Sequence, residues 1–204
     1  MSPNPTQPDP ATPTLRVGFI CARPLDEPNH LSGMPHHMAR ALRGQGVEIV
    51  ELCEHPRTPE KPPLPARAIR RARWEWKRRM PPAWQRRIDD AFPALTLKRY
   101  IGRAQRRTAI IQRLLDQMEN QNNQPDALFV CCASALLVGL KADMPIVYFS
   151  DATSHILRNT YTRYAGHGDA FFDAYHHAEK LTIPLTEAAI FASPAARDSA
   201  INDL

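Results

Sequence analysis

The chain has 204 residues, 43% of them hydrophobic, and carries a formal net charge of +5 at pH 7. A chain of this length buries a core of its own, so we expect one domain of ordinary to large size in preference to two small ones. No stretch reaches the roughly eighteen consecutive apolar residues of a membrane-spanning helix, which argues against an integral membrane protein.

The first fourteen residues contain five prolines and have neither a basic start nor an apolar middle. This composition predicts a disordered tail over residues 1–14 and not a secretion signal. We therefore expect residues 15–204 to form the folded domain.

A strand, a helix and a second strand follow the tail. The apolar run "LRVGFIC" (residues 15–21) predicts the first strand, and "VEIVELC" (residues 47–53) predicts the second. Between them, "HLSGMPHHMARALRGQG" predicts a loop and a helix that Gly44 and Gly46 close. Elements in this order predict two parallel strands of one sheet.

A strongly basic insert spans residues 57–107, with sixteen Lys/Arg against four Asp/Glu, so the remaining residues together carry a charge of minus seven. Its arginines recur at helical spacing, which predicts a basic helix that Pro81 and Pro82 end. The side chains expected to meet a membrane or another polyanion are Arg70, Arg71, Trp74, Arg78 and Arg79.

Three interpretations of this insert stay open. In the first, the insert is a solvent-exposed helix whose arginines bind no partner and only keep the protein soluble. Alternatively, a basic face with tryptophans suits anionic lipid headgroups. Positive charge also suits nucleic acid, but the sequence has no RNP, zinc-finger or helix-turn-helix signature, so a nucleic-acid partner is the least favoured of the three.

The second half alternates helical segments with short apolar runs. A long helix is predicted at about Lys98–Asn120, and apolar runs follow at residues 126–132, 145–150 and 187–193. Further helical segments are predicted at Ser134–Ala142, Asp169–Leu185 and Pro194–Asn202. Strands that are continuously apolar are covered on both faces. We therefore expect a Rossmann-like α/β domain, an open, doubly wound parallel sheet with a basic helical insert.

Small polar residues follow three of the predicted strands. Ser32 and Gly33 follow the first, Ser134 follows residues 126–132, and Asp151 and Thr153 follow "PIVYFS". Ligands of open parallel sheets bind at these carboxyl ends. Asp151 or Thr153 could also simply cap a helix beginning near Ser154. There is no GxGxxG and no GxxxxGK[ST], which argues against a dinucleotide site or a P-loop.

The four cysteines stand in or at the end of apolar runs and not at metal-ligand spacings, so we expect reduced core thiols of a cytoplasmic protein. The adjacent pairs His36-His37 and His176-His177 point about 100° apart on a helix, which suits no shared metal. No metal or cofactor is expected.

The order of four segments resembles the N-terminal half of retaining glycosyltransferases of the family 4 type, which have the two-Rossmann-domain (GT-B) architecture. These segments are "LSGMPHHMARALRGQGVEIVEL", "QPDALFVCCAS", "PIVYFSDAT" and "AEKLTIPLTEAAIFASPAARDSAI". The matching features are Ser32-Gly33, Gly46-Val47, Pro145, Asp151, Glu179 and Ser193, and the likeness covers residues 15–204.

The resemblance implies transfer of a sugar from a nucleotide-sugar donor to the hydroxyl group of an acceptor. A lipid-linked molecule or a polysaccharide would be the acceptor. It makes this chain the acceptor-side half, with Asp151 as the catalytic candidate. It makes Ser32, Gly33, Ser134, Thr153 and Tyr161 the substrate-binding candidates, although Tyr161 could equally pack in the core.

This chain departs from the family in two ways. Ser150-Asp151 stands where a histidine is frequent, and the donor domain with its pair of glutamates is missing from the sequence. We therefore expect little or no activity without a donor domain, supplied in cis or in trans. The alternative is a non-catalytic α/β module that docks on an anionic membrane or another polyanion. Either protein would be cytoplasmic, with peripheral contact at the inner membrane face left open.

Overall fold

The computed structural model describes residues 14–54, 71–72, 75–76, 79–160 and 166–204. Residues 1–13 of the expected tail lie outside this part of the chain, as does most of the predicted basic helix. Arg70, Trp74, Arg78 and Tyr161 lie outside it as well.

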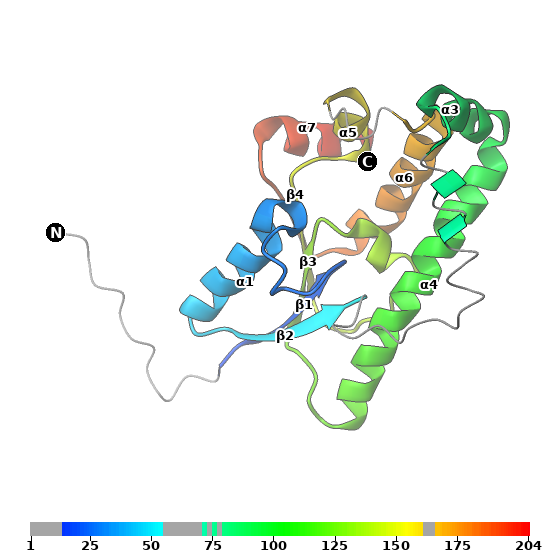
Figure 1. Cartoon of the computed structure of the whole chain (residues 1–204). Helices are drawn as coiled ribbons and strands as arrows, with labels where there is room; N and C mark the ends of the chain where they lie inside the picture. The colour runs from blue at the N-terminus through cyan, green and yellow to red at the C-terminus, as the bar shows by residue number, and fades with distance from the viewer. Residues whose placement is uncertain (1–13, 55–70, 73–74, 77–78, 161–165) are drawn as a thin grey trace.

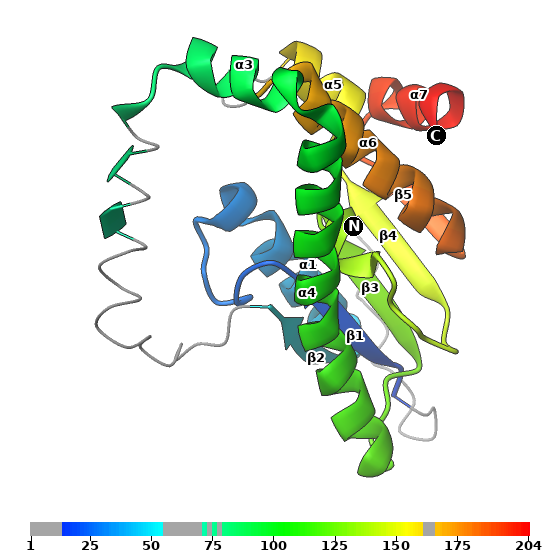
Figure 2. The ribbon, with the colours of Figure 1, turned by 90° about the vertical axis from the view of Figure 1, so that its right-hand side faces the viewer.

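The core is a five-stranded parallel sheet (Figures 1 and 2). Its order is β2-β1-β3-β4-β5, so the predicted open α/β sheet is confirmed. The strands are β1 (Arg16–Cys21), β2 (Glu48–Cys53), β3 (Ala127–Cys131), β4 (Ile146–Ser150) and β5 (Ala188–Phe191).

Helices cover both faces of the sheet, because neighbouring residues of each strand point to opposite sides. Phe19 and Cys131 face α1 (Met34–Gly44), and their cluster includes Met34 and Met38. Ile20, Val130 and Tyr148 face the other layer, which contains α4 (Pro93–Asn120) and α6 (Asp169–Thr182). Figure 1 shows α1 on one side of the strands and α4 on the other.

The helices around the insert differ in part from the prediction. α4 begins at Pro93, ahead of the expected Lys98, and a separate helix α3 (Pro82–Ala91), which we did not predict, precedes it. Both helices carry proline in the first turn, where a missing N–H costs nothing. The double proline therefore starts a helix as well as ending one.

Residues 134–142, predicted to be helical, do not form an α-helix. They contain only the 3₁₀ turn η2 (Ser134–Leu137), because Val138 is extended and Gly139 has a φ of 79°. A left-handed glycine ends helical structure. The prediction was wrong here because a short apolar run does not separate a helix from a buried turn.

The last part of the chain follows the prediction closely. The helices α5 (Ser154–Thr160) and α7 (Pro194–Asp203) begin where expected. α6 stops at Thr182 and continues as the 3₁₀ turn η4 (Ile183–Leu185), in which Pro184 lies. A further 3₁₀ turn, η1 (His30–Gly33), leads into α1.

α3 is held against the start of α6 at the carboxyl end of the sheet, where Figures 1 and 2 place α5 and α7 as well. The Asp90 carboxylate accepts a hydrogen bond from the backbone N–H of Ala170 at 3.0 Å. A Cβ added to Gly168 would lie 2.8 Å from the carbonyl oxygen of Arg86. Glycine at this position therefore permits the close approach of the two helices.

Candidate functional site

The order of the strands defines where a ligand crevice lies. From β1 the chain passes through α1 to β2, and α4 then returns it to β3 on the other side of β1. Connections that leave in opposite directions open a crevice outside the carboxyl ends of β1 and β3. The residues after these two strands, and after neighbouring β4, form the candidate site.

Three loops meet at this point through two sulfur contacts. The Sδ atom of Met34, the first residue of α1, lies 3.8 Å from Sγ of Cys132. That Sγ lies 3.7 Å from Oδ1 of Asp151, which follows β4. We call Gly33, Met34, Cys132 and Asp151 the rim cluster. It joins Asp151 to the Ser32-Gly33 turn through a cysteine that the sequence placed in the core.

Two adjacent cysteines end the apolar run of β3, and they lie in different environments. Cys131 ends β3 and its Sγ lies 3.9 Å from Sδ of Met38, inside the α1 layer. Cys132 leaves the strand with a φ of 49° and is only half-buried. Cys132 thus lies just outside the strand, where its thiol contacts Met34 and Asp151.

The backbone before α1 is unusual. Leu31, Ser32 and Gly33 have φ values of 48°, 56° and 80°. Positive φ is costly for residues with a Cβ, and such strain gathers at functional sites. A Cβ on Gly33 would also lie 2.8 Å from the carbonyl oxygen of Pro28. The turn therefore requires glycine and brings backbone close to the crevice.

The two cysteines differ in acidity. The pKa of Cys132 is lowered, chiefly because the Cys131 thiol hydrogen-bonds to it. The same hydrogen bond, together with burial, raises the pKa of Cys131 above its usual range. Cys132 is therefore the thiol of the pair that ionises first, next to the Asp151 carboxylate.

Two of the predicted binding residues lie below the surface. Ser134 is fully buried, and its hydroxyl has no hydrogen-bond partner among the described residues. Thr153 is 1% exposed, and its Oγ1 lies 2.7 Å from the hydroxyl oxygen of Ser199. Thr153 also accepts a 3.4 Å hydrogen bond from the N–H of Ile156, so it caps α5. Capping, the alternative raised from the sequence, is what this threonine does.

Of the other predicted residues, Gly33 is buried and Asp151 is half-buried. Ser32 is exposed beside Gly33, and Arg71 and Arg79 are exposed in the insert. The structure thus brings Ser32, Gly33 and Asp151 to one rim, and it separates them from the buried Ser134 and Thr153.

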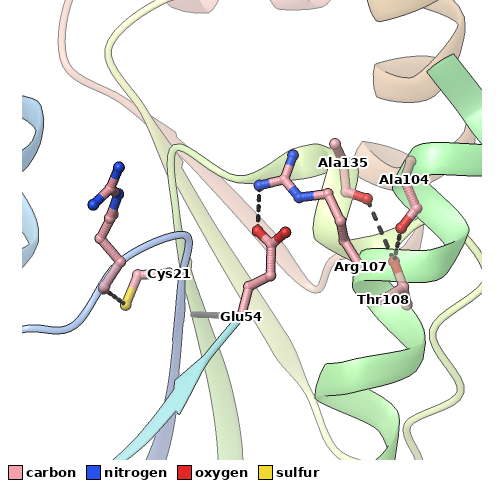
Figure 3. Close-up of polar contacts among 7 residues, drawn as sticks. Cys21, Glu54, Ala104, Arg107, Thr108 and Ala135 are labelled. Atoms are coloured by element: carbon pink, nitrogen blue, oxygen red, sulfur yellow. Dashed lines mark hydrogen bonds and ion pairs between the residues drawn. The ribbon is translucent and has the colours of Figure 1, made fainter. Parts of the chain in front are cut away.

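An ion pair lies at the carboxyl end of β2, which is on the other side of β1 from β3 (Figure 3). Arg107 of α4 lies 2.5 Å from the carboxylate of Glu54, just after β2. The neighbouring Thr108 hydroxyl donates to the carbonyl oxygens of Ala104, at 3.1 Å, and Ala135, at 3.4 Å. These contacts fix α4 to the ends of β2 and β3. One arginine of the basic insert is therefore partnered within the body of the domain.

No group of three or more His, Cys, Asp or Glu side chains suited to a metal ion occurs in the described ranges. Among the helices of the same ranges, none is long and apolar enough to cross a bilayer. No protein-family model, no curated protein and no solved structure matches this chain.

Proposed function

We propose that this chain is the acceptor-side domain of a glycosyltransferase that moves a sugar from a nucleotide-sugar donor to an acceptor hydroxyl. The observation that carries the proposal is the rim cluster, because it places the Asp151 carboxylate next to the strained Ser32-Gly33 turn at the switch point of the sheet. The order of the segments that resemble family 4 glycosyltransferases supports the same function.

Asp151 and the turn before α1 each have a role in such a reaction. Asp151 hydrogen-bonds an acceptor hydroxyl or stabilises the positive charge that develops on the sugar. The backbone at Ser32-Gly33 and the start of α1 approach the donor phosphates across the cleft, since free amides at a helix start attract anions. Positioning supplies much of the rate enhancement, and it requires a donor domain opposite this rim.

The last strand offers a surface that a donor domain or another subunit would cover. Leu181, Leu185 and Ile190 around β5 are 45%, 59% and 48% exposed. Large apolar side chains gathered at one edge of a sheet are typical of surfaces covered by further structure.

Titration of the isotopically labelled chain, followed by NMR, tests this function. Simple glycosides and polyols serve as acceptor probes, and nucleoside diphosphates serve as donor probes. We expect acceptors to shift the amide signals of Gly33, Cys132 and Asp151, and Asp151→Asn to weaken this response about tenfold. Asp116→Asn, at an exposed carboxylate near the far end of α4, is the matched control. A rim that no acceptor perturbs would refute the proposal.

A second function is favoured by a separate observation, the exposed surface of α3 and of the described residues on either side of it. It exposes the large apolar side chains of Trp76, Trp84, Ile88, Phe92 and Leu95. Basic side chains of the same segments are exposed as well: Arg79, Arg86, Arg87, Lys98 and Arg99. Exposed aromatic and basic side chains in the same part of the chain suit the surface of an anionic membrane. Docking there is compatible with transfer to a membrane-bound acceptor.

Vesicle sedimentation tests the docking function. We expect binding to vesicles that contain phosphatidylglycerol, weak binding to pure phosphatidylcholine, and release at high salt. Arg86→Glu with Arg87→Glu should abolish binding, whereas Arg113→Glu on the exposed side of α4 should not. Equal binding to neutral vesicles would contradict the electrostatic part of this function.

A further inference from the structure

A pocket of about 260 Å³ lies behind α3, between the first turns of α4 and α6. Its apolar wall includes Trp76, Met80, Ile88, Tyr100 and Phe171. The ring centroids of Tyr100 and Phe171 lie 5.7 Å apart in an edge-to-face arrangement. This contact joins α4 to α6, so the wall is a packed surface of the domain.

Two arginines give the pocket its charge. Arg99 and Arg103 line it, one turn apart on α4, and the other titratable side chains of its described lining are Asp89 and His167. Neither arginine makes an ion pair or a hydrogen bond within the described part of the chain. Both guanidinium groups are exposed and available to an anion. Guanidinium groups bind phosphate strongly because they donate several hydrogen bonds in a fixed plane.

The pocket shares two side chains with the exposed apolar group around α3. Trp76 and Ile88 line the pocket and are also 60% and 42% exposed. A molecule held between Arg99 and Arg103 thus has exposed apolar side chains beside it. A free sugar phosphate has only the small C–H face of its ring for this wall, and a neutral lipid has no anionic group for the arginines.

We propose that this pocket binds a single anionic amphiphile, a lipid that carries a phosphate head. The phosphate binds Arg99 and Arg103, and the apolar chain lies along Ile88 and Trp76, because His167 stacks on the ring of Phe171 with the centroids 3.9 Å apart. The pocket and Asp151 lie at the same end of the sheet, since α3, α5 and the start of α6 gather there (Figure 2). If the chain is a transferase domain, a lipid in this pocket makes the acceptor lipid-linked. This role as an acceptor rests on the proposed transferase function, whereas the binding of lipid does not.

Calorimetric titration of the full chain with dihexanoyl phosphatidic acid, kept below its micelle concentration, tests the proposal. Dihexanoyl phosphatidylcholine, inorganic phosphate and uridine diphosphate are the comparison probes. We expect the phosphatidic acid to bind at least about tenfold more tightly than each of them. Equal binding of phosphatidylcholine, of phosphate alone or of the nucleotide would overturn the proposal.

Variants separate the pocket from the docking face and from general charge. Arg99→Gln with Arg103→Gln should weaken binding of the phosphatidic acid about tenfold or more. Arg106→Gln with Arg113→Gln removes the same charge from the same helix outside the pocket lining, and it should leave the affinity unchanged. Trp84→Gln should lower vesicle binding without changing the affinity for the monomeric lipid.

A loss of affinity in the control pair equal to that in the pocket pair would also overturn the proposal. The outcome for the transferase function is read separately. Acceptor shifts at Gly33, Cys132 and Asp151 report on the rim, and the affinity for phosphatidic acid reports on the pocket. Failure of one measurement therefore leaves the other interpretable.

Discussion

The carboxylate of Glu179 holds the start of α5 through the backbone N–H of Ser154, at 3.0 and 3.2 Å from its two oxygens. Glu179 lies on α6 and is 1% exposed, so this contact joins two helices at the carboxyl end of β4. The Glu179 carboxylate therefore caps α5 together with the hydroxyl of Thr153, which accepts from the N–H of Ile156. It also positions the loop that carries Asp151.

The burial of Glu179 makes the stability of the domain depend on pH, while its hydrogen bond to Ser154 opposes the shift in pKa. Burial raises the pKa of Glu179 from 4.5 to about 7. The folded state therefore binds a proton that the unfolded chain has released in this interval. The contribution of Glu179 to the free energy of unfolding is complete below pH 4.5, decreases up to about pH 7 and is constant above it, with a total change of up to about 3 kcal/mol.

Urea unfolding at a series of pH values measures this change, and Glu179→Gln is the comparison variant. The glutamine keeps a carbonyl oxygen for the Ser154 N–H and has no titrating group. We expect the difference in stability between the two proteins to vary with pH over this interval and to be constant above it. The same pH dependence in both would show that another group is responsible.

Gly168 permits α3 to lie against α6, so Gly168→Ala should displace it. The added Cβ would lie 2.8 Å from the carbonyl oxygen of Arg86. This oxygen belongs to the backbone of α3, so the helix itself has to shift to relieve the contact. We expect a loss of about 1 to 3 kcal/mol of stability and faster hydrogen exchange in α3. Gly102→Ala, where the nearest atom is 3.7 Å away in the middle of α4, should stabilise by up to about 1 kcal/mol. Unchanged exchange in α3 would contradict the close approach.

The turn before α1 depends on Gly33. Gly33→Ala introduces a residue with a Cβ at a φ of 80°, together with a contact of 2.8 Å to the Pro28 carbonyl oxygen. We expect a loss of about 1 to 3 kcal/mol and altered NMR shifts at Cys132. Gly44→Ala, with no atom within 4 Å of the new Cβ, is the control and should be close to neutral. If the two variants unfold at the same urea concentration, the strain assigned to the turn is wrong.

The Arg107–Glu54 pair should contribute to stability because it is mostly buried. The side chain of Glu54 is 10% exposed and that of Arg107 is 31% exposed. Arg107→Gln leaves the Glu54 carboxylate without its cation, and we expect a loss of about 1 to 3 kcal/mol. Adding Glu54→Gln should restore part of the loss. Additive effects in this double-mutant cycle, measured by urea unfolding, would show that the two groups do not interact.

Periodicity predicted the sheet well because its strands are continuous apolar runs. The runs ending at Cys21, Cys131 and Ser150 are strands with both faces covered, and Pro145 precedes β4 where its missing N–H is tolerated. We did not predict α3 because we interpreted Pro81 and Pro82 only as the end of a helix. The many charged residues that follow also leave few apolar residues to indicate a new one. Ser134–Ala142 was wrong because the left-handed Gly139 interrupts an apolar run that otherwise suits a helix.

The sequence alone determined the class of fold, the position of Asp151 at the end of a strand and the basic character of residues 57–107. These properties depend on local patterns of apolar, charged and turn-forming residues. Only the tertiary structure decided that Cys132 joins Asp151 to the turn at Gly33, that Thr153 and Ser134 are buried, and that Glu179 caps α5. Such contacts join residues far apart along the chain, and the packing of whole layers sets their distances.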